Sequence, residues 1–89
     1  MNINYKQKEL IDFFSKTAKE KFPEIEYKDL SVSPDDPDHI WINVLSNMNE
    51  EREIEFWDFA SQIEADIDTD YGYRISIMLE NPNPAYILP

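Results

Sequence analysis

Three aspartates at alternate positions form the most suggestive chemical pattern in this sequence. Asp66, Asp68 and Asp70 have the spacing with which an EF-hand loop begins to ligate calcium. The pattern then breaks, because Gly72 comes one position too late and Ile77 stands where the loop needs a bidentate glutamate. We therefore expect a solvated helix end here, with a basic partner as the alternative.

A second acidic cluster adjoins the only histidine. Asp35, Asp36 and Asp38 directly precede His39 and together offer oxygen and nitrogen ligands. Aspartate is common in turns, however, because its side chain bonds nearby backbone, and a metal site needs ligands that converge. We expect a hairpin turn, and a weak divalent-metal site is the alternative.

The residues of covalent and phosphate chemistry are missing. There is no cysteine, no Gly-x-Ser-x-Gly sequence to present a nucleophilic serine, and one glycine, too few for a phosphate-binding loop. Nothing selects a catalytic pair among the nineteen acids. We expect no enzyme, no catalytic residue and no cofactor.

The first element that positions these groups is an amphipathic helix at about residues 4–21. Asn4 is a suitable N-cap with Gln7 three residues later, and Pro23 ends the helix because proline disfavours helical geometry in the residue before it. The apolar stripe consists of Leu10, Ile11, Phe14, Ala18 and Phe22.

A second helix is predicted at about residues 49–71, with Asn47 or Asn49 as its N-cap. Gly72 follows it, where a left-handed residue is suited to end a helix. Its apolar stripe consists of Phe56, Phe59, Ala60, Ile63 and Ile67.

Three segments alternate apolar and polar residues, as strands do. They span residues 24–33, 39–46 and 73–80, and the alternation of the first slips once near residues 28–29, which predicts a β-bulge. Residues 34–38 contain two prolines and three aspartates, which favours a hairpin loop between the first two strands.

The predicted order is therefore α-β-β-α-β in a single domain of residues 1–89. A strand, a helix and a strand in sequence favour a right-handed crossover, and both helices then bury their stripes on one face of the sheet. The fold class is an α+β (α/β) two-layer sandwich with three strands. Residues 81–89 either cover the opposite face or add a fourth strand.

That opposite, outer face of the sheet is expected to be partly apolar. Trp41, Leu45 and Met78 share its parity. An uncovered apolar patch is typical of an interface, so the alternatives are coverage by the tail, self-association into a homodimer, and a foreign partner.

Trp57 lies at the border of the apolar stripe of the second helix. One interpretation is that it closes the edge of the core. The other is an aromatic anchor for a partner, with Glu53, Glu64 and Asp68 as its acidic rim.

The net charge of −11 narrows the class of partner. Residues 1–28 carry a net +1 and residues 29–89 a net −12, so the acidity belongs to the later part of the chain. This charge argues against nucleic acid as a ligand. The chain has no apolar run long enough for a membrane span, and the lack of cysteine fits a cytoplasmic location.

These observations predict a small acidic protein-interaction domain that binds a basic protein partner, like an inhibitor, immunity protein or antitoxin. The first alternative is a homodimeric subunit that associates through the outer sheet face. The second is a weak divalent-metal-binding protein. The residues expected to bind a partner are Trp41, Leu45, Met78, Trp57, Glu53, Glu64, Asp66, Asp68 and Asp70.

Overall fold

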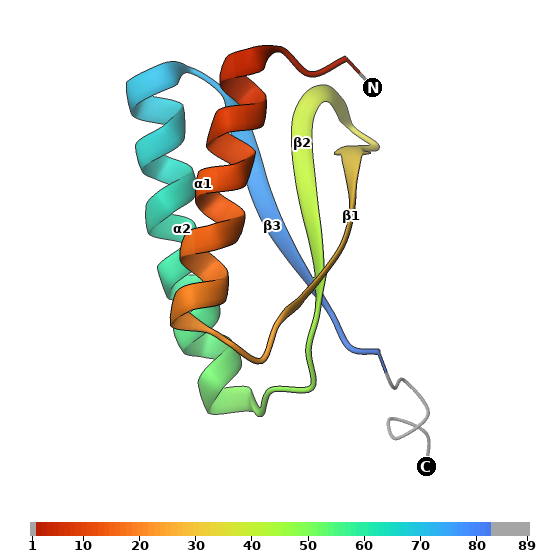
Figure 1. Cartoon of the computed structure of the whole chain (residues 1–89), viewed down its shortest axis with the longest axis vertical. Helices are drawn as coiled ribbons and strands as arrows, with labels where there is room; N and C mark the ends of the chain where they lie inside the picture. The colour runs from red at the N-terminus through yellow and green to blue at the C-terminus, as the bar shows by residue number, and fades with distance from the viewer. Residues whose placement is uncertain (1, 83–89) are drawn as a thin grey trace.

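The computed structural model describes residues 2–82. Its elements are α1 (Tyr5–Lys21), β1 (Glu26–Ser33), β2 (Asp36–Leu45), α2 (Glu50–Tyr71) and β3 (Arg74–Glu80). The sheet has the order β1-β2-β3, with β1 antiparallel and β3 parallel to β2. Both helices lie side by side on one side of this sheet and run in opposite directions (Figure 1). The α+β fold and its element order are therefore as predicted.

Both helices begin and end with the signals expected. Asn4 caps α1 in a reciprocal capping box with Gln7, in which the two hydrogen bonds measure 2.8 and 3.0 Å. Asn49, rather than Asn47, caps α2 by accepting from the backbone N–H of Arg52 at 2.9 Å. Gly72 ends α2 in left-handed geometry with φ of 73°.

The β-hairpin confirms the bulge and corrects the turn. The register of β1 against β2 shifts between Tyr27 and Asp29, as the slip in alternation predicted. The predicted loop at residues 34–38 was too long, because β2 begins at Asp36, which pairs with Ser33. The side chain of Asp36 accepts from the backbone N–H of Asp38 at 3.0 Å, as an aspartate in a turn does. This bond lies next to a second irregularity in the register of β1 against β2.

The core fills the space between the helix layer and the sheet. The alternation of β2 and β3 sends their apolar residues inward, where Phe14, Phe22 and Phe56 are fully buried. Phe22 and Phe56 meet edge to face with ring centroids 5.1 Å apart. The buried sheet residues are Ile40, Ile42, Val44, Ile75 and Ile77. This packing fixes how α1 and α2 lie against each other.

Arg52 ties the start of α2 to the end of α1. Its guanidinium donates to Glu24 at 2.7 Å and to the carbonyl of Lys21 at 2.9 Å, and it lies 4.2 Å from the ring centroid of Phe22. The hydrogen bond from Arg52 lowers the pKa of Glu24.

Within residues 2–82, neither helix has the length and apolarity that a membrane crossing requires.

Candidate functional site

The acidic run at the end of α2 divides between two surfaces. The helix continues without a break to Tyr71, so Asp66 and Asp68 point about 200° apart around its axis. Asp66 and Asp70 border a groove between the two helices. Glu64 and Asp68 face β3 instead. An EF-hand arrangement is excluded, because side chains on opposite faces of one helix do not converge on an ion.

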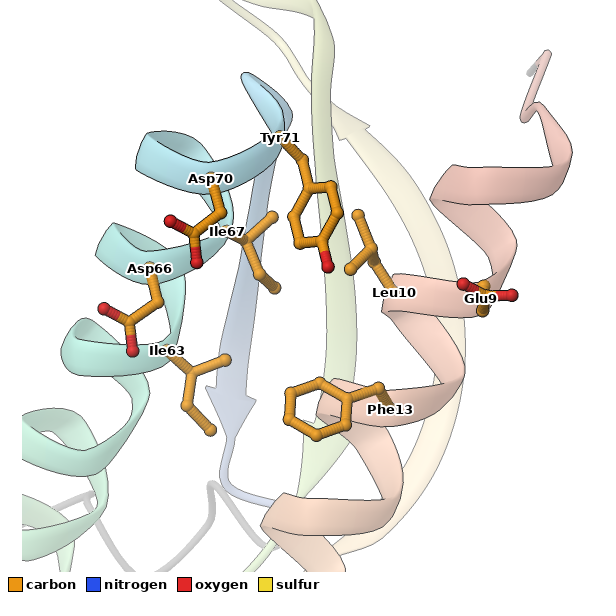
Figure 2. Close-up of a pocket in the computed structure, with 8 residues that line it drawn as sticks. All are labelled: Glu9, Leu10, Phe13, Ile63, Asp66, Ile67, Asp70 and Tyr71. Atoms are coloured by element: carbon orange, nitrogen blue, oxygen red, sulfur yellow. The ribbon is translucent and has the colours of Figure 1, made fainter.

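An apolar groove lies between α1 and α2. Figure 2 shows Ile63, Ile67 and Tyr71 projecting from α2 toward α1. Leu10 and Phe13 project toward them from α1 (Figure 2). The groove has a volume of about 470 Å³ and is lined by Glu9, Leu10, Phe13, Ile63, Asp66, Ile67, Asp70 and Tyr71. We call it the α1/α2 groove.

Its floor and its walls differ in exposure. Leu10 and Ile67 form a floor that belongs to the core, with 6% and 3% of their surface exposed. Phe13 and Tyr71 form the walls and stay 55% and 48% exposed. Two large aromatic side chains therefore present apolar surface to solvent on either side of one hollow, an arrangement typical of interaction sites.

The charge around this groove has one sign. Three carboxylates, those of Glu9, Asp66 and Asp70, line it, and none of its described lining residues is basic. The last turn of α2 contains no basic residue either. Within residues 2–82, Asp66 and Asp70 make no ion pair, although they lie at the negative end of the α2 dipole. Within residues 2–82, no cation therefore compensates the two aspartates on the α2 side of the groove.

One lysine stands near the Tyr71 end of the groove. Lys6 pairs with Glu9 at 2.8 Å, and its ammonium lies 4.9 Å from the Tyr71 ring centroid. The hydrogen bond to Glu9 raises the pKa of Lys6. Glu9 is thus partly neutralised within the chain, whereas the two aspartates across the groove are not.

The other half of the acidic run belongs to a smaller hollow at the β3 edge. It has a volume of about 200 Å³ and is lined by His39, Glu64, Ala65, Asp68, Arg74, Ile75 and Ser76. Ser76 is only 8% exposed and has the parity of the outer sheet face. Its hydroxyl donates to Oε1 of Glu64 at 2.7 Å and lies 2.6 Å from Nε2 of His39. The Glu64 side chain therefore reaches past the edge of β3.

The order of donors in this Glu64–Ser76–His39 chain differs from that of a nucleophile and its general base. A serine hydroxyl has one proton, and Ser76 gives it to Glu64, so His39 must donate to Ser76 instead of accepting from it. A general base would need the reverse order. Sequence reasoning missed this chain, because it joins residues of three separate elements, β2, α2 and β3.

Arg74 pairs with one of the turn aspartates. Its guanidinium donates to Asp36 at 2.9 Å rather than to an acid at the end of α2. Asp36 also accepts from the backbone N–H of Asp38 at 3.0 Å. Among residues 2–82, no group of three or more histidine, aspartate or glutamate side chains is arranged to hold a metal ion.

The outer sheet face places a polar side chain among the apolar residues predicted to form one patch. Asn43 lies between Trp41 and Leu45 on β2, directly opposite Met78. Its amide donates to Asp29 at 2.7 Å and to Ser31 at 3.0 Å. Trp41, Leu45 and Met78 are each half-buried around this polar centre. The part of the tail predicted to cover them, residues 83–89, lies outside the described residues.

Trp57 lies at the edge of the core. It is half-buried and packs edge to face on Phe56 with centroids 5.4 Å apart. Of its predicted acidic rim, Glu53 is exposed and Glu64 is turned to Ser76. This packing favours the core-edge interpretation of Trp57.

Among these surfaces, the α1/α2 groove alone combines exposed aromatic walls with carboxylates that have no partner in the described chain. Sequence reasoning named Asp66 and Asp70 but missed Phe13 and Tyr71, which lie beside the apolar stripes. Comparison with protein-family models, with curated proteins and with solved structures finds no match for this chain.

Proposed function

We propose that this protein is a small acidic interaction domain that binds a basic protein partner through the α1/α2 groove. The proposal is carried by one observation: exposed Phe13 and Tyr71 lie around one hollow with the carboxylates of Asp66 and Asp70, which form no ion pair within residues 2–82. Aromatic anchors inside a charged rim are the usual anatomy of a protein interface. A binding module of the inhibitor, immunity-protein or antitoxin kind, in the cytoplasm, fits this surface better than an enzyme.

The charge and the apolar surface have separate roles in this proposal. The net charge of −11 speeds and orients the approach of a cationic protein. The apolar walls of the groove then supply affinity as they are removed from water. A surface of this kind also disfavours acidic partners, because their carboxylates would be repelled by the carboxylates of Asp66 and Asp70.

The proposal is tested with two peptides of the same apolar pattern and opposite charge, one of leucine and lysine and one of leucine and glutamate. Isothermal calorimetry should detect binding of the lysine peptide alone. Phe13→Ala should weaken that binding about tenfold, as loss of an aromatic anchor does. Tyr27→Ala is the matched control, because Tyr27 is a similarly exposed aromatic outside the groove, and it should leave the affinity unchanged. Equal binding of both peptides, or equal loss in both variants, contradicts the proposal.

Self-association through the outer sheet face is the second candidate. The half-buried side chains of Trp41, Leu45 and Met78 on a sheet face opposite both helices favour it. Sedimentation equilibrium at high micromolar concentration would show a dimer that Trp41→Ser dissociates. A monomer under these conditions contradicts this second candidate and leaves the groove proposal standing.

A further inference from the structure

The α1/α2 groove restricts the conformation of whatever occupies it. We infer that the partner docks a single amphipathic α-helix there, with lysine or arginine flanking its apolar stripe. The inference rests on the proposed function and adds the form of the recognised segment.

The backbone of the groove walls favours a helical occupant over a strand. Both walls are regular α-helices, Tyr5–Lys21 and Glu50–Tyr71, whose central N–H and C=O groups bond within each helix. An extended segment in the groove would therefore find no backbone partners, and its buried N–H groups would lose their bonds to water. A helix satisfies its own backbone and presents only side chains. This difference in backbone hydrogen bonding favours a helix over a strand as the occupant of the groove.

The apolar side chains of the groove repeat at helical spacing. Ile63, Ile67 and Tyr71 project once per turn from α2, over a length of about 12 Å. Leu10 and Phe13 face them from α1. A partner helix segment of about two turns, with apolar residues three or four positions apart, matches this length and spacing.

The carboxylates of the groove also determine where positive charge should lie on the partner helix. Asp66 and Asp70 are four residues apart, so they stand one turn apart along the α2 side of the groove. Two cations four positions apart on the partner helix would face both. On the α1 side Glu9 is already paired with Lys6, so less positive charge is needed there.

The test uses three lysine–leucine peptides of about eighteen residues, long enough to form a helix on binding. The first has leucines at helical spacing, the second has the same composition in scrambled order, and the third is the first with two central prolines. Affinity is measured by calorimetry, helix formation by circular dichroism, and the binding site by amide NMR shifts. The Phe13→Ala and Tyr27→Ala variants report whether the groove is used.

The first peptide should gain helicity on binding, shift the amides around Phe13 and Ile67, and bind about tenfold or more tightly than the other two. Groove binding by the proline peptide with equal affinity overturns the helical occupant and leaves the proposed function intact. Helical binding that Phe13→Ala does not weaken places the peptide elsewhere and overturns the inference. Failure of all three peptides to shift groove residues overturns the proposed function together with the inference.

Discussion

The acidic end of α2 should lower the stability of the folded protein, and removing one of its carboxylates should therefore stabilise it. Asp70 lies in the last turn of α2, where the helix dipole is negative, and Asp66 is one turn away with the same charge. Asp70→Asn removes an unfavourable dipole interaction of about 0.3–1 kcal/mol and a like-charge repulsion of about 0.2–0.5 kcal/mol. Aspartate and asparagine have similar helix propensities, so the electrostatic change dominates.

The control is Glu51→Gln in the first turn of the same helix. It removes one negative charge as well, but from the positive end of the dipole, where a carboxylate stabilises the helix by about 0.3–1 kcal/mol. Any general relief of the −11 net charge is common to both variants. The difference between them, about 0.8–2.5 kcal/mol in favour of Asp70→Asn, isolates the local field at the two ends.

Urea denaturation and thermal melting at low salt measure this difference, and a domain of this size shifts its Tm by about 4–8 °C per kcal/mol. In about 1 M salt the screening length falls to about 3 Å, and most of the difference should disappear. Equal stability of the two variants at low salt, or a difference that survives high salt, would show that the field of the α2 dipole does not set their stability. A confirmed result would mean that the carboxylate of Asp70 lowers the stability of the free protein.

Three other predictions concern the contacts that hold the fold. Ser76→Ala should destabilise the protein by about 1–3 kcal/mol in urea titrations, because Glu64 loses the donor of its 2.7 Å hydrogen bond in a largely buried place; an unchanged free energy of unfolding would show that the contact is idle. Arg52 lowers the pKa of Glu24 in the folded state, so the stability from this pair is present above the unfolded-state pKa of about 4.3 and is lost as the pH falls through the lower folded-state pKa. Arg52→Ala should flatten this part of the stability–pH profile, and a profile that keeps its slope contradicts the assignment. Gly72→Ala should lower the free energy of unfolding by about 1–2 kcal/mol in the same assay, because an alanine at φ of 73° is strained. A steric clash is not the cause, since an added Cβ would meet no atom within 4 Å. Wild-type stability of this variant would contradict the claim of backbone strain.

The elements of this fold were predictable because each leaves a local mark in the sequence. The capping pair Asn4 and Gln7, the single Gly72 and the alternation of the strands give element types and most boundaries. The start of β2 at Asp36 was missed, since aspartates and prolines in a strand irregularity have the composition of a loop. The composition of residues 34–38 reports a preference for turns and does not show that Asp36 pairs with Ser33.

The candidate site was predictable only in part, because it depends on how elements pack. Helical periodicity divides Asp66 and Asp70 from Glu64 and Asp68, but it does not say which neighbour each pair faces. Phe13 lies just outside the apolar stripe of α1, so its role in the α1/α2 groove follows only from the position of α2. The bond between Glu64 and Ser76 likewise depends on α2 lying at the β3 edge.

The most direct test of the account is an amide NMR map of the protein titrated with the lysine–leucine helix. The largest shifts should cluster on residues of the α1/α2 groove, from Leu10 and Phe13 on α1 to Ile67 and Tyr71 on α2. Salt should weaken the binding, because the carboxylates of the groove attract the peptide. Shifts centred instead on Trp41 and its neighbours on the outer sheet face would contradict the claim that the helix layer is the binding surface.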